Sequence, residues 1–309
     1  MSRFEDEMAG EAAPGGCPAV EMVIRGRVRD IGGLNVARLL PYAKRRAIGP
    51  FVFFDRMGPV GFAPGTGLDV PPHPHIGLAT LTYLFQGAIV HRDSLGTVAT
   101  IRPGAVNLMT AGHGVAHSER TAPEDRPGGS VLDGVQIWLA QPKPEEQGAP
   151  GFAHHAAEDL PELRIGTGIT LRVVAGEAYG ARSPVAAPGG ALCLDLALDD
   201  GAAFEVPDAA PERGLVVIDG AVLIDGEPHE AGMLAVLRAG SRPRLQASGG
   251  LARVMLIGGP PLDGPRSMWW NFVASDPALI EEAKRDWASG DPRFPAVAEE
   301  DSRLPLPQS

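Results

Sequence analysis

Cysteine is scarce in this chain of 309 residues, which contains only Cys17 and Cys193. The two lie far apart in sequence and in dissimilar contexts, so they provide no disulfide framework. A low cysteine content without such a framework is typical of proteins in a reducing compartment. We therefore expect a cytoplasmic protein, in which any metal site would use no thiolate.

Positive charge is also in short supply. The chain has 27 Lys and Arg against 38 Asp and Glu, which gives a formal net charge of −11. This balance excludes a broad electrostatic attraction to nucleic acid. The tight basic cluster at residues 44–46 fits a solvated turn better than a phosphate site. We expect no direct nucleic-acid partner.

Long apolar runs are missing as well. No segment approaches the length that spans a membrane, so we expect no membrane partner. The acidic, glycine-rich start of the chain lacks the basic and apolar regions of a signal peptide. We expect residues 1–18 to form a flexible tail.

Glycine and proline are abundant, with 40 and 30 residues, and 44% of the chain is hydrophobic. These turn formers are spread evenly among short segments of Val, Leu, Ile and Thr. Such a pattern predicts many short strands joined by tight turns rather than long helices. The expected class is all-β, with a sandwich or barrel architecture.

The strand pattern divides the chain into two similar halves. The strands expected in the first half are residues 22–24, 35–40, 51–55, 78–85, 88–92, 98–102, 106–109 and 133–139, with a Gly/Pro-rich loop at 57–72. Those expected in the second half are residues 169–175, 191–198, 214–218, 221–224, 233–238 and 252–257. We predict a first barrel with a metal site at 19–140, a linker at 141–165 and a second barrel without metal at 166–265. A C-terminal aromatic segment, helix and tail would occupy 266–309.

One helix is clearly indicated near the C-terminus, from Pro277 to about Ala288. Asp276 suits the N-cap, proline suits the first helical position, and Gly290 suits the end. Its apolar stripe would consist of Ile280, Ala283 and Trp287. We expect this stripe to pack on a barrel together with the preceding Trp269, Trp270 and Phe272.

Histidine is concentrated in one region. Five of the eight lie in a short stretch: His73, His75, His91, His113 and His117. In an extended segment alternate side chains share a face, so His73 and His75 would project together, in phase with Ala79, Leu81, Tyr83 and Phe85 if the strand continues. By the same alternation His117 and Glu119 would project side by side. Two such strands meeting face to face inside a barrel could surround an ion with three nitrogens and one carboxylate.

This ligand set indicates a transition-metal site. A lone His-x-His is more often a surface or core pair, but the added His-x-Glu favours metal binding. Imidazole and carboxylate together suit iron, manganese, cobalt, nickel, copper or zinc. An octahedral ion with four protein ligands would keep two positions for water, oxygen or substrate, which is a reactive arrangement.

The two remaining histidines of the stretch have less definite roles. His91 is expected on a strand paired with the one that carries His75. It could orient a ligand by a hydrogen bond, or it could be a polar residue near a strand end. His113, between Gly112 and Gly114, is expected at the rim of the pocket.

Several motifs together resemble those of the pirin family, whose members are bicupins of the cupin superfamily. The motifs are 53–55, 73–75, 80–84, 109–112, 117–119, 176–178 and 269–273, so the resemblance covers most of the chain. It implies two stacked antiparallel β-barrels of jelly-roll type with a short C-terminal helix. It also implies one iron-type divalent metal, Fe(II) first among the candidates, in the first barrel, held by His73, His75, His117 and Glu119. The first cupin motif usually has a Glu shortly after His-x-His, whereas this chain has Ala79, which leaves Glu119 as the only carboxylate.

The resemblance also implies a function. It suggests a quercetin 2,3-dioxygenase, in which a metal-bound flavonol reacts with O2 and its central ring is cleaved with loss of carbon monoxide. Glu119 would be the catalytic residue that accepts the substrate's proton, and the pocket would be lined by Phe53, Met57, Leu78 and Met109. Two alternatives are a non-catalytic redox-sensing regulator that acts through a protein partner, and a metal-free cupin that binds a small molecule.

Overall fold

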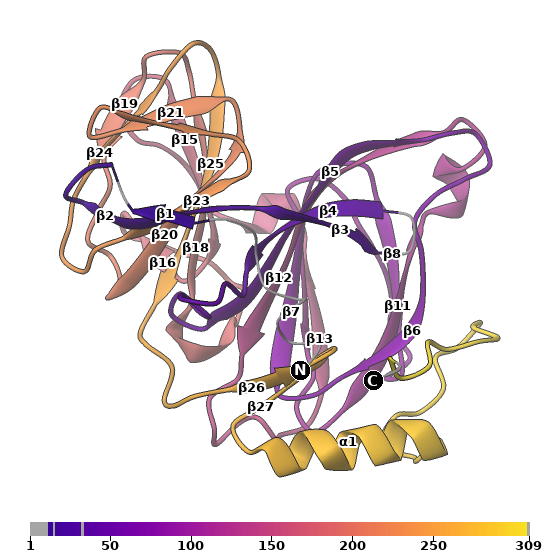
Figure 1. Cartoon of the computed structure of the whole chain (residues 1–309). Coiled ribbons are helices and arrows are strands. Elements are labelled where there is room, and N and C mark those ends of the chain that lie inside the picture. Colours follow the sequence, from indigo (N-terminus) through magenta and orange to yellow (C-terminus); the bar gives the residue numbers. More distant parts are fainter. Residues whose placement is uncertain (1–11, 15, 32–33, 308–309) are drawn as a thin grey trace.

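The many short apolar segments fold into two antiparallel β-barrels, as the sequence predicts, and a single α-helix follows them (Figure 1). The computed structural model describes residues 12–14, 16–31 and 34–307. Within the predicted tail, residues 12–14 form strand β1 (Ala12–Pro14), which pairs with β2 (Val20–Arg25). Residues 1–11 and 15 lie outside the described residues.

The first barrel consists of two sheets. Its seven-stranded sheet contains, in spatial order, β13 (Gly151–His155), β10 (Val106–Thr110), β7 (Leu78–Gln86), β12 (Ser130–Ala140), β5 (Phe51–Phe62), β4 (Leu34–Leu40) and β3 (Arg27–Ile31). The four-stranded sheet contains β6 (Asp69–His75), β11 (Val115–Thr121), β8 (Ile89–Asp93) and β9 (Val98–Ile101). A 3-10 turn, η1 (Pro123–Asp125), precedes β12.

The second barrel has the same plan. Its larger sheet contains β1, β2, β23 (Met233–Leu237), β20 (Glu212–Asp219), β25 (Ala252–Gly259), β18 (Leu192–Leu198), β15 (Ile169–Ala175) and β14 (Glu162–Arg164). Its smaller sheet contains β19 (Ala203–Glu205), β24 (Arg244–Ala247), β21 (Ala221–Ile224) and β22 (Glu227–Glu230). The remaining elements are η2 (Ala157–Asp159), β16 (Glu177–Ala178), β17 (Ala181–Arg182), η3 (Pro188–Gly190), β26 (Ser267–Trp269), β27 (Phe272–Ala274) and α1 (Pro277–Ser289).

The first described strands, β1 and β2, belong to the second barrel. β2 was expected in the first barrel, but it pairs with β23, with Val23 opposite Ala235. The chain enters the first barrel only at β3, which pairs with β4. The local pattern of a strand shows which of its faces is apolar, but not which distant strand it pairs with.

Residues 141–165 were expected as a linker, yet they contain strand β13. This strand completes the edge of the seven-stranded sheet, where Phe152 lies opposite Met109. β14 follows and pairs with β15 in the second barrel. The prolines around β13 suggested a linker, but they lie outside a short edge strand, which needs hydrogen bonds on one side only.

The predicted loop at 57–72 is also shorter than expected. β5 continues to Phe62, and β6 starts at Asp69. Gly58 and Pro59 lie where the pairing of β5 with β12 shifts register, between the partners of Leu132 and Gly134. A bulge of this kind admits proline because its backbone nitrogen has no ladder partner there.

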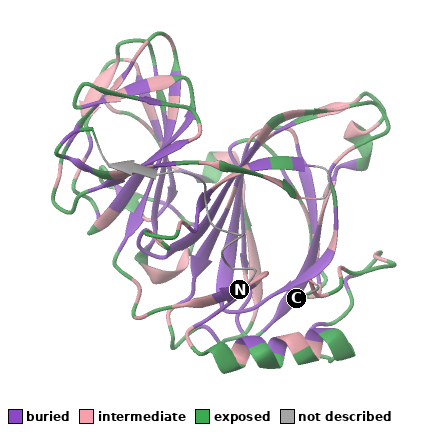
Figure 2. Ribbon diagram, viewed as in Figure 1, coloured by how far each residue is buried: buried purple, intermediate pink, exposed green. Residues whose placement is uncertain are grey.

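The two larger sheets share one apolar core between the barrels (Figure 2). On β12, Val135, Ile137 and Leu139 belong to this core, whereas the alternate side chains Gln136 and Trp138 line a cavity inside the first barrel. These sheets are therefore covered on both faces, which explains their nearly continuous hydrophobic runs.

Helix α1 confirms its sequence signals. The side chain of Asp276 accepts a hydrogen bond from the backbone N–H of Ala278, and Gly290 ends the helix with a φ of 75°. Ile280, Ala283 and Trp287 are its buried residues, as expected. They pack with Phe272 against the first barrel. Among the described residues, no helix has the length and hydrophobicity that a membrane crossing requires.

A polar contact joins the two barrels. The hydroxyl of Tyr83 donates a 2.8 Å hydrogen bond to Asp195 of the second barrel. The same carboxylate accepts two hydrogen bonds from Arg253, whose guanidinium lies 4.1 Å from the centre of the Phe85 ring. Because Tyr83 is buried, its hydroxyl needs a hydrogen-bond partner, and Asp195 provides one.

We predict that Tyr83→Phe lowers the free energy of unfolding by about 1–2 kcal/mol, since a buried hydrogen bond to a charged group is lost while Arg253 still pairs Asp195. Urea unfolding followed by circular dichroism measures this change. The control is Tyr179→Phe, because Tyr179 is 47% exposed. Equal stability of the two variants would contradict a stabilising contact between the barrels.

Candidate metal centre

Two neighbouring strands bring the three histidines together. β6 pairs with β11, and His73 lies directly opposite His117 in this pairing. The expectation that the ligands face one another across the barrel is therefore wrong: they come from adjacent strands of one sheet. The pairing shifts register between His117 and Glu119, so a β-bulge lies within the second motif.

The predicted continuation of the His73 and His75 face along β7 is also wrong. The chain turns at Gly77, where φ is 65° and where an added Cβ would lie 2.0 Å from the carbonyl oxygen of Val273. After this turn, Ala79, Leu81 and Tyr83 point into the core between the barrels, whereas His73 and His75 line the cavity. Only glycine fits this turn.

The imidazole rings form a compact buried cluster. Their centroids are 4.4 Å apart for His73 and His117, 4.9 Å for His75 and His117, and 5.0 Å for His73 and His75. The Nε2 atoms of His75 and His117 lie 3.0 Å apart. Each of the three residues offers one nitrogen within 4.8 Å of the other two.

Neighbouring groups fix how these rings are protonated. Nδ1 of His73 donates a 3.0 Å hydrogen bond to the carbonyl oxygen of Pro71, which leaves Nε2 of His73 as the lone-pair nitrogen. Nδ1 of His117 lies 3.2 Å from Nδ1 of His91, and Nε2 of His91 lies 3.0 Å from a carboxylate oxygen of Asp93. Since the carboxylate of Asp93 accepts the hydrogen of His91 Nε2, we assign His91 Nδ1 as the acceptor from His117.

His91 thus contacts His117, a candidate ligand, as expected of a residue that orients a ligand by a hydrogen bond. The pairing of its strand differs from the prediction. Its strand β8 pairs with β11, the strand of His117, and not with the strand of His75. Phe152 of β13 stacks on the His91 ring at 4.5 Å between centroids. Burial raises the pKa of Asp93, but the hydrogen bonds from His91 and Thr97 outweigh it and lower that pKa overall.

The cluster favours neutral imidazole. Burial lowers the pKa of His73 to about 4. Burial, reinforced by repulsion from the neighbouring histidines, also holds the pKa of His75 and His117 well below its usual value. Neutral imidazoles with their lone pairs directed at one point are the form that binds a metal ion.

The donor set fits a mononuclear transition metal. Two nitrogens bound at right angles to one ion, each at about 2.1 Å, lie about 3.0 Å from each other. The separation of His75 Nε2 from His117 Nε2 is 3.0 Å. His73, His75 and His117 are the only such group of three among residues 12–14, 16–31 and 34–307.

Glu119 lies near this group but not within it. Its side chain lines the same cavity as His73 and His75. Its carboxylate accepts a 3.2 Å hydrogen bond from Gln136, which in turn accepts one from Thr82. Burial raises the pKa of Glu119, although His91 and Gln136 act in the opposite direction.

The cavity beside the histidines has a volume of about 250 Å³. One wall is a column of stacked groups: the Trp138 ring lies edge-on to His75 at 5.4 Å, and Phe53 stacks on Trp138 at 3.9 Å. The Arg38 guanidinium covers Phe53 at 4.3 Å and binds Asp55 through two 2.8 Å hydrogen bonds. The cavity is thus largely apolar and aromatic, with a few fixed polar groups.

Two of the four residues expected to line the pocket do so, namely Phe53 and Met57. Leu78 and Met109 are buried in apolar clusters and are not among the residues that line the cavity. His113 is exposed and bonds the carbonyl oxygen of Gly148, so it does not form the pocket rim.

Several residues that line the cavity were not predicted from the sequence to do so: Gln136, Trp138, Trp270, Asn271 and Leu304. The alternation of polar and apolar residues on β12 could have found Gln136. The same alternation places Trp138 on the face of Gln136. No local signal marks Trp270, Asn271 and Leu304, because they reach the cavity from segments distant in sequence. Trp270, expected only as core, has a φ of 51° in the turn between β26 and β27 and lines the cavity.

Known proteins resemble this chain over most of its length. Residues 33–139 match the family model for pirin, and residues 193–295 match the model for the pirin C-terminal cupin domain. A pirin-like protein of Caulobacter vibrioides is 42% identical over 294 residues, which cover 94% of this chain and all of that protein.

Two solved structures from Acinetobacter baumannii, both named quercetin 2,3-dioxygenase, share the fold. One has a TM-score of 0.86 at 34% identity and covers 99% of this chain and 97% of its own. The other has a TM-score of 0.82 at 29% identity and covers 88% and 97%. These likenesses extend over both barrels, and with the family models they show that the chain belongs to the pirin family, with its bicupin fold.

Proposed function

We propose that this protein is a mononuclear metal-dependent dioxygenase that cleaves flavonols such as quercetin with O2. The observation that carries the proposal is the cluster of three buried, neutral imidazoles at an aromatic cavity that also contains a carboxylate. The two similar structures named quercetin 2,3-dioxygenase support it.

His73, His75 and His117 would hold the ion, and we propose Glu119 as its fourth ligand. Fe(II) is our first candidate, with Ni, Cu, Mn, Co or Zn as alternatives, because such sites take metals by availability as well as by affinity. When bound, the ion would act as a Lewis acid that lowers the pKa of a flavonol hydroxyl, and it would bring O2 close to the substrate.

Glu119 is the proposed catalytic base. Burial raises its pKa, which makes its carboxylate a better proton acceptor than an exposed one. Gln136 holds one carboxylate oxygen, which leaves the second oxygen to bind the ion or to accept a proton from a substrate hydroxyl. The reaction joins both atoms of O2 to the flavonol skeleton as one carbon leaves as carbon monoxide, and Glu119 returns its proton to the product.

The aromatic wall would orient the substrate. Flat flavonol rings can stack beside the Phe53 and Trp138 column, which leads toward His75. The apolar lining excludes water, which strengthens electrostatic interactions with the substrate. The cavity therefore fits a planar aromatic ligand better than a sugar or a polyanion.

We predict that His75→Ala and His117→Ala abolish stoichiometric metal binding, since each removes one of three imidazoles. Elemental analysis after reconstitution with Fe(II), Ni(II) or Zn(II) measures this. The control His113→Ala removes an exposed histidine outside the cluster and should keep one ion per chain. Full metal content in the His75 and His117 variants would exclude these ligands.

We predict that His91→Phe weakens metal binding about 10–100-fold, because His117 loses the group that fixes its tautomer while stacking with Phe152 is retained. Competition with a chromogenic chelator measures the dissociation constant. His113→Phe is again the control. An unchanged constant would show that His91 does not orient His117.

We predict that Glu119→Gln lowers quercetin turnover per bound metal by about 10²–10⁴-fold, since the general base is lost. Loss of quercetin absorbance together with carbon monoxide release measures turnover. Glu124→Gln, an exposed carboxylate, is the control. If fully metal-loaded wild type turns over none of several flavonols, the reaction is excluded and the redox-sensing regulator becomes the next hypothesis to test.

A further inference from the structure

The outer part of the metal cavity is built by the C-terminal segment of the chain. The match to the pirin C-terminal model ends at residue 295, and the described chain continues to residue 307. This segment returns along the first barrel beside β6 and β11 (Figure 1). Leu304, near its end, lines the cavity together with His73 and Trp270.

The backbone of Leu304 is held on both sides. Its N–H donates a 2.8 Å hydrogen bond to the carbonyl oxygen of Pro72, the residue before His73. Its carbonyl oxygen accepts a 2.9 Å hydrogen bond from the indole Nε1 of Trp287 on helix α1. The backbone of Leu304 is therefore fixed relative to the strand that carries two of the histidines.

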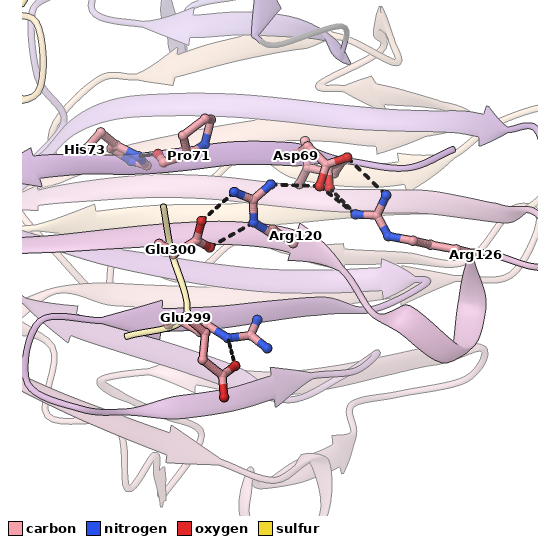
Figure 3. Close-up of polar contacts among 9 residues, drawn as sticks. Asp69, Pro71, His73, Arg120, Arg126, Glu299 and Glu300 are labelled. Carbon is pink, nitrogen blue, oxygen red and sulfur yellow. Dashed lines mark hydrogen bonds and ion pairs between the residues drawn. The ribbon is translucent and has the colours of Figure 1, made fainter. Parts of the chain in front are cut away.

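A partly buried ion pair anchors the same segment upstream. Glu300 is 4% exposed and accepts hydrogen bonds from Nε and Nη2 of Arg120 at 2.8 and 2.5 Å. Figure 3 shows that Arg120 also contacts Asp69, which Arg126 binds from the other side. The neighbouring Glu299 makes only an exposed contact with Arg92. Two fixed carboxylate contacts at Glu300 thus place the segment on β11, one residue from Glu119.

The segment also contacts helix α1, because the Arg303 guanidinium lies 4.3 Å from the centre of the Trp287 ring and Leu306 packs against the apolar cluster of the helix. Between these contacts, a second cavity of about 420 Å³ lies beneath the segment, with Pro72 and Glu300 among its lining residues. A segment that lies partly over a cavity buries less area than one packed along its whole length, so it opens more readily. The anchors at Glu300 and Leu304 therefore control whether it is closed.

We propose that residues 299–306 form a strap over the metal cavity, and that Leu304 on this strap is a specificity-determining residue that limits the size of the aromatic ligand reaching the histidines. The ligand class rests on the proposed function. The closing role of the strap does not, because it concerns access to the three imidazoles by any small molecule.

Access to the site is tested with zinc-loaded, full-length protein and a chromogenic chelator. Release of zinc should be about tenfold faster in Leu304→Ala and in Glu300→Gln, because each weakens closure of the strap. The matched controls are Leu251→Ala, which shortens an exposed leucine of the second barrel, and Glu299→Gln, which removes the exposed neighbour of Glu300. Equal release rates in all five proteins would overturn the strap.

Ligand size is tested by binding of quercetin and its 3′-O-methyl ether to the same zinc proteins, followed by tryptophan fluorescence. Leu304→Ala should shift the preference toward the ether about tenfold, the scale of one methyl group in an apolar pocket, and Leu304→Trp should weaken both. An unchanged preference in both variants would overturn the role of Leu304. If zinc release responds to the strap but wild type binds neither flavonol, the proposed function fails and the strap stands.

Discussion

The pairing of β6 with β11 is the interaction on which the candidate site depends. It places His73 opposite His117 and leaves His75 at the end of β6, where the chain must turn at Gly77. The three imidazoles therefore lie together in one buried cluster, and strands rather than long loops hold them. Because these ligands belong to strands, their spacing is set by backbone hydrogen bonds, which makes the arrangement rigid before any ion binds.

The same strands of the larger sheet serve two structures at once. On β12, one set of alternate side chains fills the core between the barrels, while Gln136 and Trp138 serve the cavity. The second barrel therefore supports the site indirectly, since it covers the outer face of the sheet that forms the cavity wall. A change in the core between the barrels would reach the metal centre through this shared sheet.

The fold class, six strands of the second barrel (β15, β18, β20, β21, β23 and β25), helix α1 and the histidine cluster could be predicted from sequence, because each has a local pattern of period, caps or spacing. The pairing of β2 with the second barrel and the edge strand β13 could not, since pairing is decided by distant partners. Leu304 and Trp270 reach the cavity through tertiary contacts of the C-terminal segment, which leave no signature in the residues themselves. Gly58 and Pro59 led to the prediction of a loop, although they lie within β5. A bulge admits a proline that a regular strand ladder excludes.

The structure also explains why this chain has Ala79 where the first cupin motif usually has a glutamate. Ala79 is fully buried in the core between the barrels, on the face of β7 that points away from the histidines. A glutamate there would be an unpaired charge among apolar side chains and could not reach the site. Its absence therefore removes no ligand from the histidine cluster. Glu119 enters the cavity from β11, beside the bulge that follows His117. In this chain the carboxylate and one imidazole therefore come from the same strand, and a shift of β11 would move both together.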